Sequence, residues 1–92
     1  MITIVGVKPN DDWTLTLTFS NGKVGAFDVK PYLNKGIFRE LKDVRLFKSV
    51  RIADATIEWK NGADLCPECV YENTIFKKIK KWIQKKLFVP LL

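Results

Sequence analysis

The stretch W-T-L-T-L-T-F-S-N-G-K-V-G-A-F-D-V, residues 13–29, predicts a β-hairpin. Apolar and β-branched polar residues alternate up to Phe19, which is typical of a strand with one buried face. Asn21 and Gly22 then supply the positive φ angles of a tight turn. The chain returns as a partner strand from Val24 to Val29. This hairpin is the starting point of an antiparallel sheet.

The register of this hairpin contains a conflict. Pairing about the turn sets Phe19 opposite Val24, but it also places Phe27 and Val29 on the threonine face. A sheet with one buried face would put these apolar residues on the other side. Either both faces are partly covered, or a bulge near Gly25 shifts the register.

Further short elements are predicted on both sides of this hairpin. Residues 2–7 form a third strand, and apolar residues recur at roughly helical spacing over residues 37–47, where Asp43 can cap a second short helix. Residues 50–53 and 56–59 form a second hairpin. Its register sets Arg51 opposite Glu58 and apolar residues opposite each other on the other face, so it is self-consistent.

These elements predict one α+β domain, and 92 residues suit a single small core. We expect a small antiparallel sheet of two hairpins plus an N-terminal strand, short helices between them, and a C-terminal amphipathic helix. Residues 1–72 would form the α+β body. Residues 73–92 would form the lysine-rich helix and an apolar end.

The net charge of +6 belongs to the end of the chain. Six of the 16 basic residues lie in residues 77–92, which contain no acid, so residues 1–76 carry ten basic and ten acidic side chains. The chain has no histidine, which removes His-based acid–base catalysis, nucleophile pairs with histidine and His-liganded metal sites. No apolar run reaches the length of a membrane span and no basic leader opens the chain, so a cytoplasmic location is expected.

Residues 74–87 are predicted to form the amphipathic helix, with Ile75, Ile79 and Ile83 on its apolar face. This helix could dock on its own domain, contact nucleic acid, or lie on a membrane surface or in a partner's groove. Any contact of this helix with nucleic acid would be blind to sequence, since its lysines are accompanied by no arginine. The candidate contacts with a partner or with nucleic acid are Lys77, Lys78, Lys80, Lys81, Lys85, Lys86 and Trp82.

The stretch W-K-N-G-A-D-L-C-P-E-C-V-Y-E, residues 59–72, contains a turn, a C-x-x-C pair and a helix start. Cys66 and Cys69 could bind zinc or exchange disulfides. A structural zinc site needs four ligands, however, and the chain has no other cysteine and no histidine. We therefore expect Pro67 at the first helical position, Cys66 packed as a small apolar residue, and no metal or cofactor.

Three carboxylates in the same stretch, Asp64, Glu68 and Glu72, offer a weaker alternative. They could hold a hard cation or act as general acid and base, although carboxylates are also favoured at a helix start for electrostatic reasons alone. Turn, acid and helix start in succession could form a small notch that binds an anion or a peptide. The residues of this candidate notch are Trp59, Asn61, Gly62, Asp64, Leu65, Cys66, Pro67 and Glu68.

Four runs of the chain resemble the small bacterial family called domain of unknown function 2442. They are V-K-P-N-D-D-W-T-L-T-L-T-F-S-N-G-K-V (7–24), F-D-V-K-P-Y-L (27–33), L-K-D-V-R-L-F (41–47) and W-K-N-G-A-D-L-C-P-E (59–68). The signature positions that the resemblance implies are Phe27, Asp28, Pro31, Trp59, Asn61, Gly62, Asp64 and Leu65. Cys69 lies outside this pattern, and Ala55 stands where a glycine commonly follows the aspartate.

The resemblance implies an α+β fold like the N-terminal domain of two-domain bacterial proteins in which a helix-turn-helix module follows. Members of this family also occur as stand-alone chains, and they are associated with toxin–antitoxin-like neighbours. The resemblance implies no activity. Because a lysine-rich tail replaces the helix-turn-helix, the DNA binding of that module does not carry over. We expect a non-enzymatic protein-interaction or regulatory module with a protein partner or self-association. The alternatives are sequence-nonspecific nucleic-acid binding and, more weakly, the carboxylate metal site.

Overall fold

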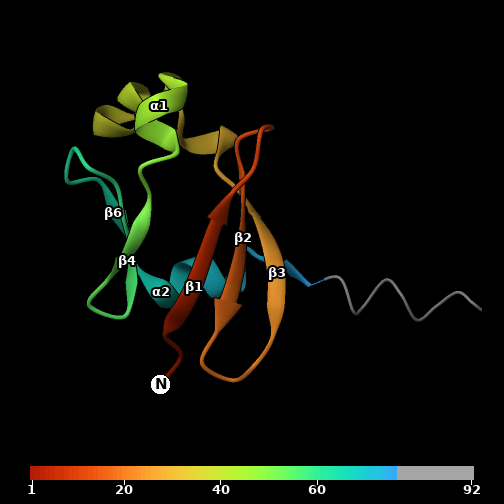
Figure 1. Ribbon diagram of the computed structural model, residues 1–92. Helices are drawn as coiled ribbons and strands as arrows, with labels where there is room; N and C mark the ends of the chain where they lie inside the picture. Colours follow the sequence, from red (N-terminus) through yellow and green to blue (C-terminus); the bar gives the residue numbers. More distant parts are fainter. Residues whose placement is uncertain (77–92) are drawn as a thin grey trace, which may run out of the picture.

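In the computed structural model, which describes residues 1–76, the alternating stretch forms the centre of an antiparallel sheet (Figure 1). Its strands are β1 (Ile4–Pro9), β2 (Thr14–Phe19), β3 (Val24–Asp28) and β7 (Ile75–Phe76). Their order across the sheet is β1-β2-β3-β7. The predicted N-terminal strand is therefore confirmed.

The register of the first hairpin differs from the simple expectation by one residue. Thr18 lies opposite Val24 and Leu15 opposite Phe27, so the predicted pairing of Phe19 with Val24 is wrong. The cause is a three-residue loop in which Gly22 takes a φ of 87°. The longer loop turns Phe27 onto the buried face, and this removes the conflict.

Three hairpin loops share this geometry. In each, the amide of one residue donates to the carbonyl of the residue four positions later, across Asn10–Thr14, Phe19–Lys23 and Trp59–Ala63. The residue before the end of each loop has a positive φ: 66° at Trp13, 87° at Gly22 and 91° at Gly62. Glycine adopts this conformation without steric cost, whereas tryptophan does not. Trp13 is held by edge-on packing against Phe47, with ring centroids 5.0 Å apart.

The second hairpin lies in a separate sheet, which corrects the expectation of one sheet. This sheet contains β4 (Arg51–Ala53), β5 (Thr56–Glu58) and β6 (Asp64–Leu65) in that order. The predicted register is confirmed, with Arg51 opposite Glu58 and an N···O distance of 3.0 Å between their charged groups.

The β4–β5 turn connects the two sheets. Asp54 and Ala55 both have positive φ, 49° and 72°, as in a type I′ turn. Ala55 thus adopts a left-handed conformation that glycine takes more readily. The carbonyl of Ala55 accepts a 2.9 Å hydrogen bond from the amide of Ile4 in β1.

Short helices fill the connections. The 3-10 helices η1 (Lys30–Tyr32) and η2 (Gly36–Lys42) and the α-helix α1 (Val44–Phe47) follow β3, and α2 (Pro67–Glu72) follows β6. The predicted helical stretch is thus divided between η2 and α1. Asp43 caps α1 as predicted, because its carboxylate accepts from the amide of Arg45 at 3.0 Å. Pro67 occupies the first turn of α2, which confirms its predicted place.

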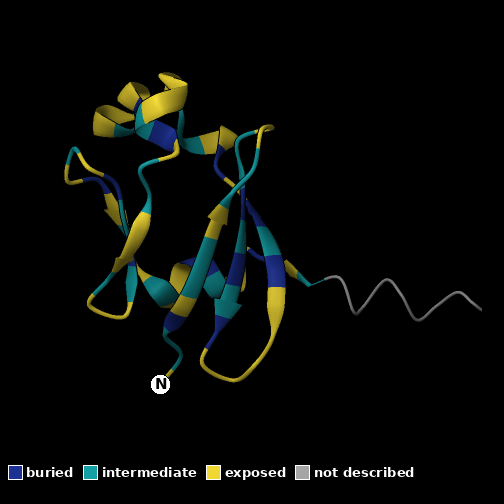
Figure 2. Cartoon of the chain, in the orientation of Figure 1, coloured by how far each residue is buried: buried dark blue, intermediate teal, exposed yellow. Residues whose placement is uncertain are grey.

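Both sheets and the helices share a single core. Figure 2 shows buried residues alternating with more exposed ones along β2 and β3. The largest fully buried side chain is Trp59, whose indole N–H donates to the carbonyl of Phe47 at 3.0 Å. The buried apolar residues are Ile4, Leu15, Leu17, Phe19, Phe27, Val29, Leu41, Phe47, Ile57, Trp59, Ala63 and Val70.

The predicted C-terminal helix is wrong at its start. The hydroxyl of Thr74 donates to the carbonyl of Val70 at 2.7 Å, and the chain then enters β7, which pairs with β3. Gly25 permits this pairing, since a Cβ there would lie 2.7 Å from the carbonyl oxygen of Ile75. Residues 77–92 of the predicted helix and apolar end lie outside the described residues. Within the described part, no helix is long and apolar enough to cross a membrane.

Candidate functional site

The first half of the predicted notch serves the fold. Trp59 is fully buried, and Gly62 provides the positive φ of the β5–β6 loop. The side-chain amide of Asn61 donates to a carboxylate oxygen of Glu40 at 2.8 Å, and its oxygen accepts from the amide of Ala63 at 3.1 Å. These contacts tie the loop to η2.

The second half of the notch lies along β6 and the start of α2. Asp64 is exposed and pairs with Glu58 through the backbone, while Leu65 is half-buried opposite Ile57. Glu68 is exposed in the first turn of α2. Among the described residues, no group of three or more His, Cys, Asp or Glu side chains is arranged to hold a metal ion. The carboxylates Asp64, Glu68 and Glu72 are therefore not gathered as the metal hypothesis required.

Cys66 does not pack as a small apolar residue, contrary to expectation. Both Cys66 and Cys69 are free and exposed. Cys66 is the N-cap residue of α2 and makes no capping hydrogen bond as a thiol. The backbone N–H groups of Cys69 and Glu68 favour its thiolate, and with the Cys69 side chain they lower the pKa of Cys66 below the ordinary thiol value. The hydrogen bond with Cys66 and the nearby negative charges raise the pKa of Cys69.

The residues predicted to contact nucleic acid or a partner belong to the C-terminal segment. Lys77, Lys78, Lys80, Lys81, Lys85, Lys86 and Trp82 all lie outside the described residues. The chain enters this segment from β7, at an edge of the four-stranded sheet as far as residues 1–76 define it. There, Ile75 is 61% exposed.

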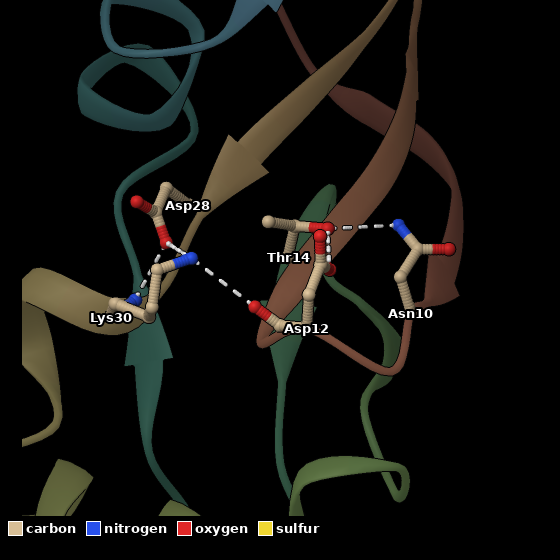
Figure 3. Close-up of polar contacts among 5 residues, drawn as sticks. All are labelled: Asn10, Asp12, Thr14, Asp28 and Lys30. Atoms are coloured by element: carbon tan, nitrogen blue, oxygen red, sulfur yellow. Dashed lines mark hydrogen bonds and ion pairs between the residues drawn. The ribbon is translucent and has the colours of Figure 1, made fainter.

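A polar cluster that sequence reasoning missed connects the β1–β2 loop to the end of β3 (Figure 3). The ammonium group of Lys30 lies 3.0 Å from a carboxylate oxygen of Asp28 and donates to the backbone carbonyl of Asp12 at 3.2 Å. The hydroxyl of Thr14 donates to the Asp12 carboxylate at 2.6 Å, and Asn10 donates to Thr14 at 3.1 Å. The Thr14 hydrogen bond is the main cause that lowers the pKa of Asp12.

This cluster borders a surface hollow of about 270 Å³, and Asp28 belongs to both. The residues that line the hollow are Phe27, Asp28, Pro31, Tyr32, Lys35 and Asn73. The buried ring of Phe27 lies 5.8 Å from the ring of Tyr32, centroid to centroid, so the apolar wall comes from the end of β3 and from η1. The exposed side chains of Asp28, Lys35 and Asn73 supply its polar groups.

Asp28 and Asn73 already have hydrogen-bond partners within the protein, whereas the ammonium group of Lys35 has no ion-pair partner within residues 1–76. One carboxylate oxygen of Asp28 already accepts from the backbone amide and pairs with the ammonium group of Lys30, each at 3.0 Å. The side-chain amide of Asn73 donates to the carbonyl of Cys69 at 2.8 Å. Within residues 1–76, Lys35 has no ion-pair partner. The hollow therefore presents an apolar surface beside an available positive charge.

The residues that line the hollow come from two parts of the sequence, and only one of them carries a recognisable pattern. The run F-D-V-K-P contains Phe27, Asp28, Lys30 and Pro31, three of which are signature positions of the resemblance. Asn73 is distant from these residues in sequence and reaches the hollow only because α2 and β7 return to β3. Local pattern reading cannot supply such a contact.

Comparison with known proteins gives one match. A family model described as "Protein of unknown function (DUF2442)" matches residues 4–76. No curated protein and no solved structure matches the chain. The matched residues include all the strands and helices described above.

Proposed function

The chain belongs to the DUF2442 family, and from this premise we propose that it is a non-enzymatic protein-interaction module. Its described body would bind a short segment of a partner protein in the hollow beside β3. The proposal includes a regulatory role, which the resemblance implies through its toxin–antitoxin-like neighbours.

The observation that carries the proposal is the place of three signature residues. Phe27, Asp28 and Pro31 all line the hollow. Phe27 lies on the buried face of β3, Asp28 at the exposed end of that strand, and Pro31 in the first turn of η1. Three of the other signature residues have structural roles: Trp59 fills the core, and Asn61 and Gly62 shape a loop. Their shared place at the hollow gives Phe27, Asp28 and Pro31 a common role in addition to the core packing of Phe27.

The size and charge of the hollow indicate the partner's chemistry. At about 270 Å³ it is smaller than sites that enclose drug-sized ligands, which are roughly 300–1,000 Å³. It suits a single apolar side chain inserted against Phe27 and Tyr32. Lys35 would then meet a carboxylate next to that side chain. The expected partner segment thus carries an aromatic or aliphatic residue beside an aspartate or glutamate.

A screen of displayed short peptides against the full chain tests this proposal. We expect retained peptides to be enriched in an apolar residue beside an acid, and Lys35→Glu to abolish their binding. Lys42→Glu is the matched control, since Lys42 is an exposed lysine of η2 that does not line the hollow. Retained peptides that bind Lys35→Glu as well as the native chain would refute the proposed site.

The lysine-rich segment carries the second part of the proposal, namely attraction of an acidic partner or self-association. Sedimentation of the full chain should be compared with a chain ended at Phe76, which keeps β7 and its contacts with Phe19 and Tyr71. An equal, monomeric mass for both would remove self-association. Affinity purification from the native host with these same two chains would show whether a partner requires the segment.

Sequence-nonspecific nucleic-acid binding is the second candidate, because residues 77–92 contain six lysines and no acidic residue. Phosphate contacts release counterions, so binding by this route must weaken steeply as salt rises. A salt titration of DNA and RNA binding with the full chain and the chain ended at Phe76 separates the candidates. Negligible affinity at low salt would eliminate nucleic-acid binding.

A further inference from the structure

Two exposed thiols lie next to each other at the start of α2 and have no evident structural role. Free cysteine is among the most frequently buried residue types, yet neither Cys66 nor Cys69 belongs to the core. The inward side of α2 is occupied by Val70, which is buried, and by Tyr71, whose ring packs edge-on against Phe19 at 4.9 Å. The thiols are thus presented to solvent by a short helix that other residues anchor.

The spacing and contact of these thiols suit a disulfide. Residues three apart on a helical turn have Cβ atoms roughly 5–6 Å apart, and a disulfide needs about 3.5–4.5 Å, so a small backbone adjustment at Cys66, the extended N-cap residue, is enough. Each of the two thiols shifts the pKa of the other, so the two side chains lie close enough to interact. Pro67 between them fixes the backbone at the first helical position.

We propose that Cys66 and Cys69 form a thiol–disulfide exchange site that reacts with low-molecular-weight disulfides, with Cys66 as the attacking thiol and Cys69 as the resolving thiol. This site is independent of the hollow beside β3. It revises the expectation that Cys66 is a packing residue.

The exchange proceeds in two balanced steps. The thiolate of Cys66 attacks one sulfur of the small disulfide, whose S–S bond breaks, and the departing thiolate takes up a proton. Cys69 then loses its proton and attacks the sulfur of Cys66, which releases the second small thiol. The protein loses two electrons and two protons, and the small disulfide gains them to become two thiols.

The electrostatics agree with this division of roles. The lowered pKa of Cys66 increases its thiolate fraction near neutral pH, whereas the raised pKa of Cys69 keeps that thiol protonated until the mixed disulfide has formed. The carboxylates of Glu68 and Glu72 contribute to the raised pKa of Cys69, and Glu68 also acts on Cys66 in the raising direction. Loss of the Glu68 charge should therefore increase the thiolate fraction of Cys66.

The test uses the reduced full chain, oxidised glutathione as the small disulfide, acid quenching and mass spectrometry. The native chain should form an intramolecular disulfide without accumulating a mixed disulfide. Cys69→Ser should accumulate the glutathione adduct at Cys66, and Cys66→Ser should react more slowly. Both positions are exposed, so both variants should fold, which tryptophan fluorescence checks.

Two results would overturn the proposal. One is equal reaction rates for Cys66→Ser and Cys69→Ser, which would remove the distinct roles. The other is an intramolecular disulfide that forms no faster in the folded chain than in the same chain unfolded in urea, where the spacing is kept but the fold is lost. As a further readout, the midpoint of the iodoacetamide rate against pH should lie at lower pH for Cys66 than for Cys69 in the native chain.

Discussion

Replacement of Ala55 by glycine should stabilise the protein, because the β4–β5 turn requires a backbone conformation that alanine adopts at a cost. The φ of Ala55 is 72°, within the left-handed region. That region costs an L-residue with a Cβ roughly 1–2 kcal/mol. Glycine avoids the cost but adds freedom to the unfolded chain, which offsets about 0.4–1 kcal/mol. The net expected gain in the free energy of unfolding is about 0.5–1 kcal/mol.

Urea denaturation followed by tryptophan fluorescence measures this change. The midpoint should rise with an unchanged slope, and the melting temperature should rise by about 2–8 °C, since about 1 kcal/mol corresponds to about 4–8 °C in a domain of this size. The gain should be global because the carbonyl of Ala55 accepts the amide of Ile4 and thereby connects the turn to the four-stranded sheet.

Gly62→Ala is the matched control in the opposite direction. Gly62 has a φ of 91°, and an added Cβ would meet no atom within 4 Å, so any effect is conformational. It should lower the free energy of unfolding by about 0.5–1 kcal/mol, from the same strain and unfolded-state terms with the sign reversed. If Ala55→Gly is destabilising while Gly62→Ala behaves as expected, the account of the β4–β5 turn as a strained type I′ turn is refuted.

Gly25→Ala should displace β7 and lower the free energy of unfolding by about 1–3 kcal/mol, because the added Cβ would overlap the backbone of that strand. Hydrogen exchange should show faster exchange of the β7 amides, and amides that stay protected would contradict the prediction. Trp59→Phe should cost about 1–3 kcal/mol in urea denaturation, since it leaves the buried carbonyl of Phe47 without its 3.0 Å donor; an unchanged midpoint would show that another donor replaces it. The pKa of Asp12 is lowered in the folded state, so its contribution to stability is present above the unfolded pKa and is lost as pH falls through the folded pKa. Thr14→Val removes the hydroxyl that lowers this pKa and should reduce the acid dependence of the denaturation midpoint. An identical pH profile would contradict the role of the hydroxyl.

Elements with strong local signals could be predicted from the sequence. The alternation over residues 13–19 gives strand β2, and the charge pair Arg51–Glu58 gives the register of the second hairpin. Asp43 and Pro67 mark helix starts because a cap carboxylate and a missing N–H act within one turn. These interactions join residues close in sequence, so the local pattern contains them.

The wrong register predicted for the first hairpin, Phe19 opposite Val24, came from an ambiguous turn sequence. The run F-S-N-G-K fits a two-residue turn as well as a three-residue loop, and the two differ by one residue in register. Burial of Phe27 on the same face as Leu17 selects the longer loop. The choice belongs to the core rather than to the turn.

The candidate sites depend even more on tertiary contacts. From the sequence, Cys66 was expected to pack as a small apolar residue, and only the anchoring of α2 by Val70 and Tyr71 leaves both thiols exposed. The hollow needs Asn73 beside Phe27, two residues that are distant in sequence.

The sequence by itself determined the α+β class, strand β2, the starts of α1 and α2, the neutral body with its basic end, and the family. Periodicity, turn residues and charge are properties of neighbouring residues, and they act before any core exists. Tertiary structure alone decided the separation into two sheets, the strand at residues 75–76 in place of a helix, and the surfaces where binding and thiol chemistry are proposed. The physical reason is that burial is shared by the whole chain: the small Gly25 leaves space on β3, and a segment fifty residues away fills it as a strand.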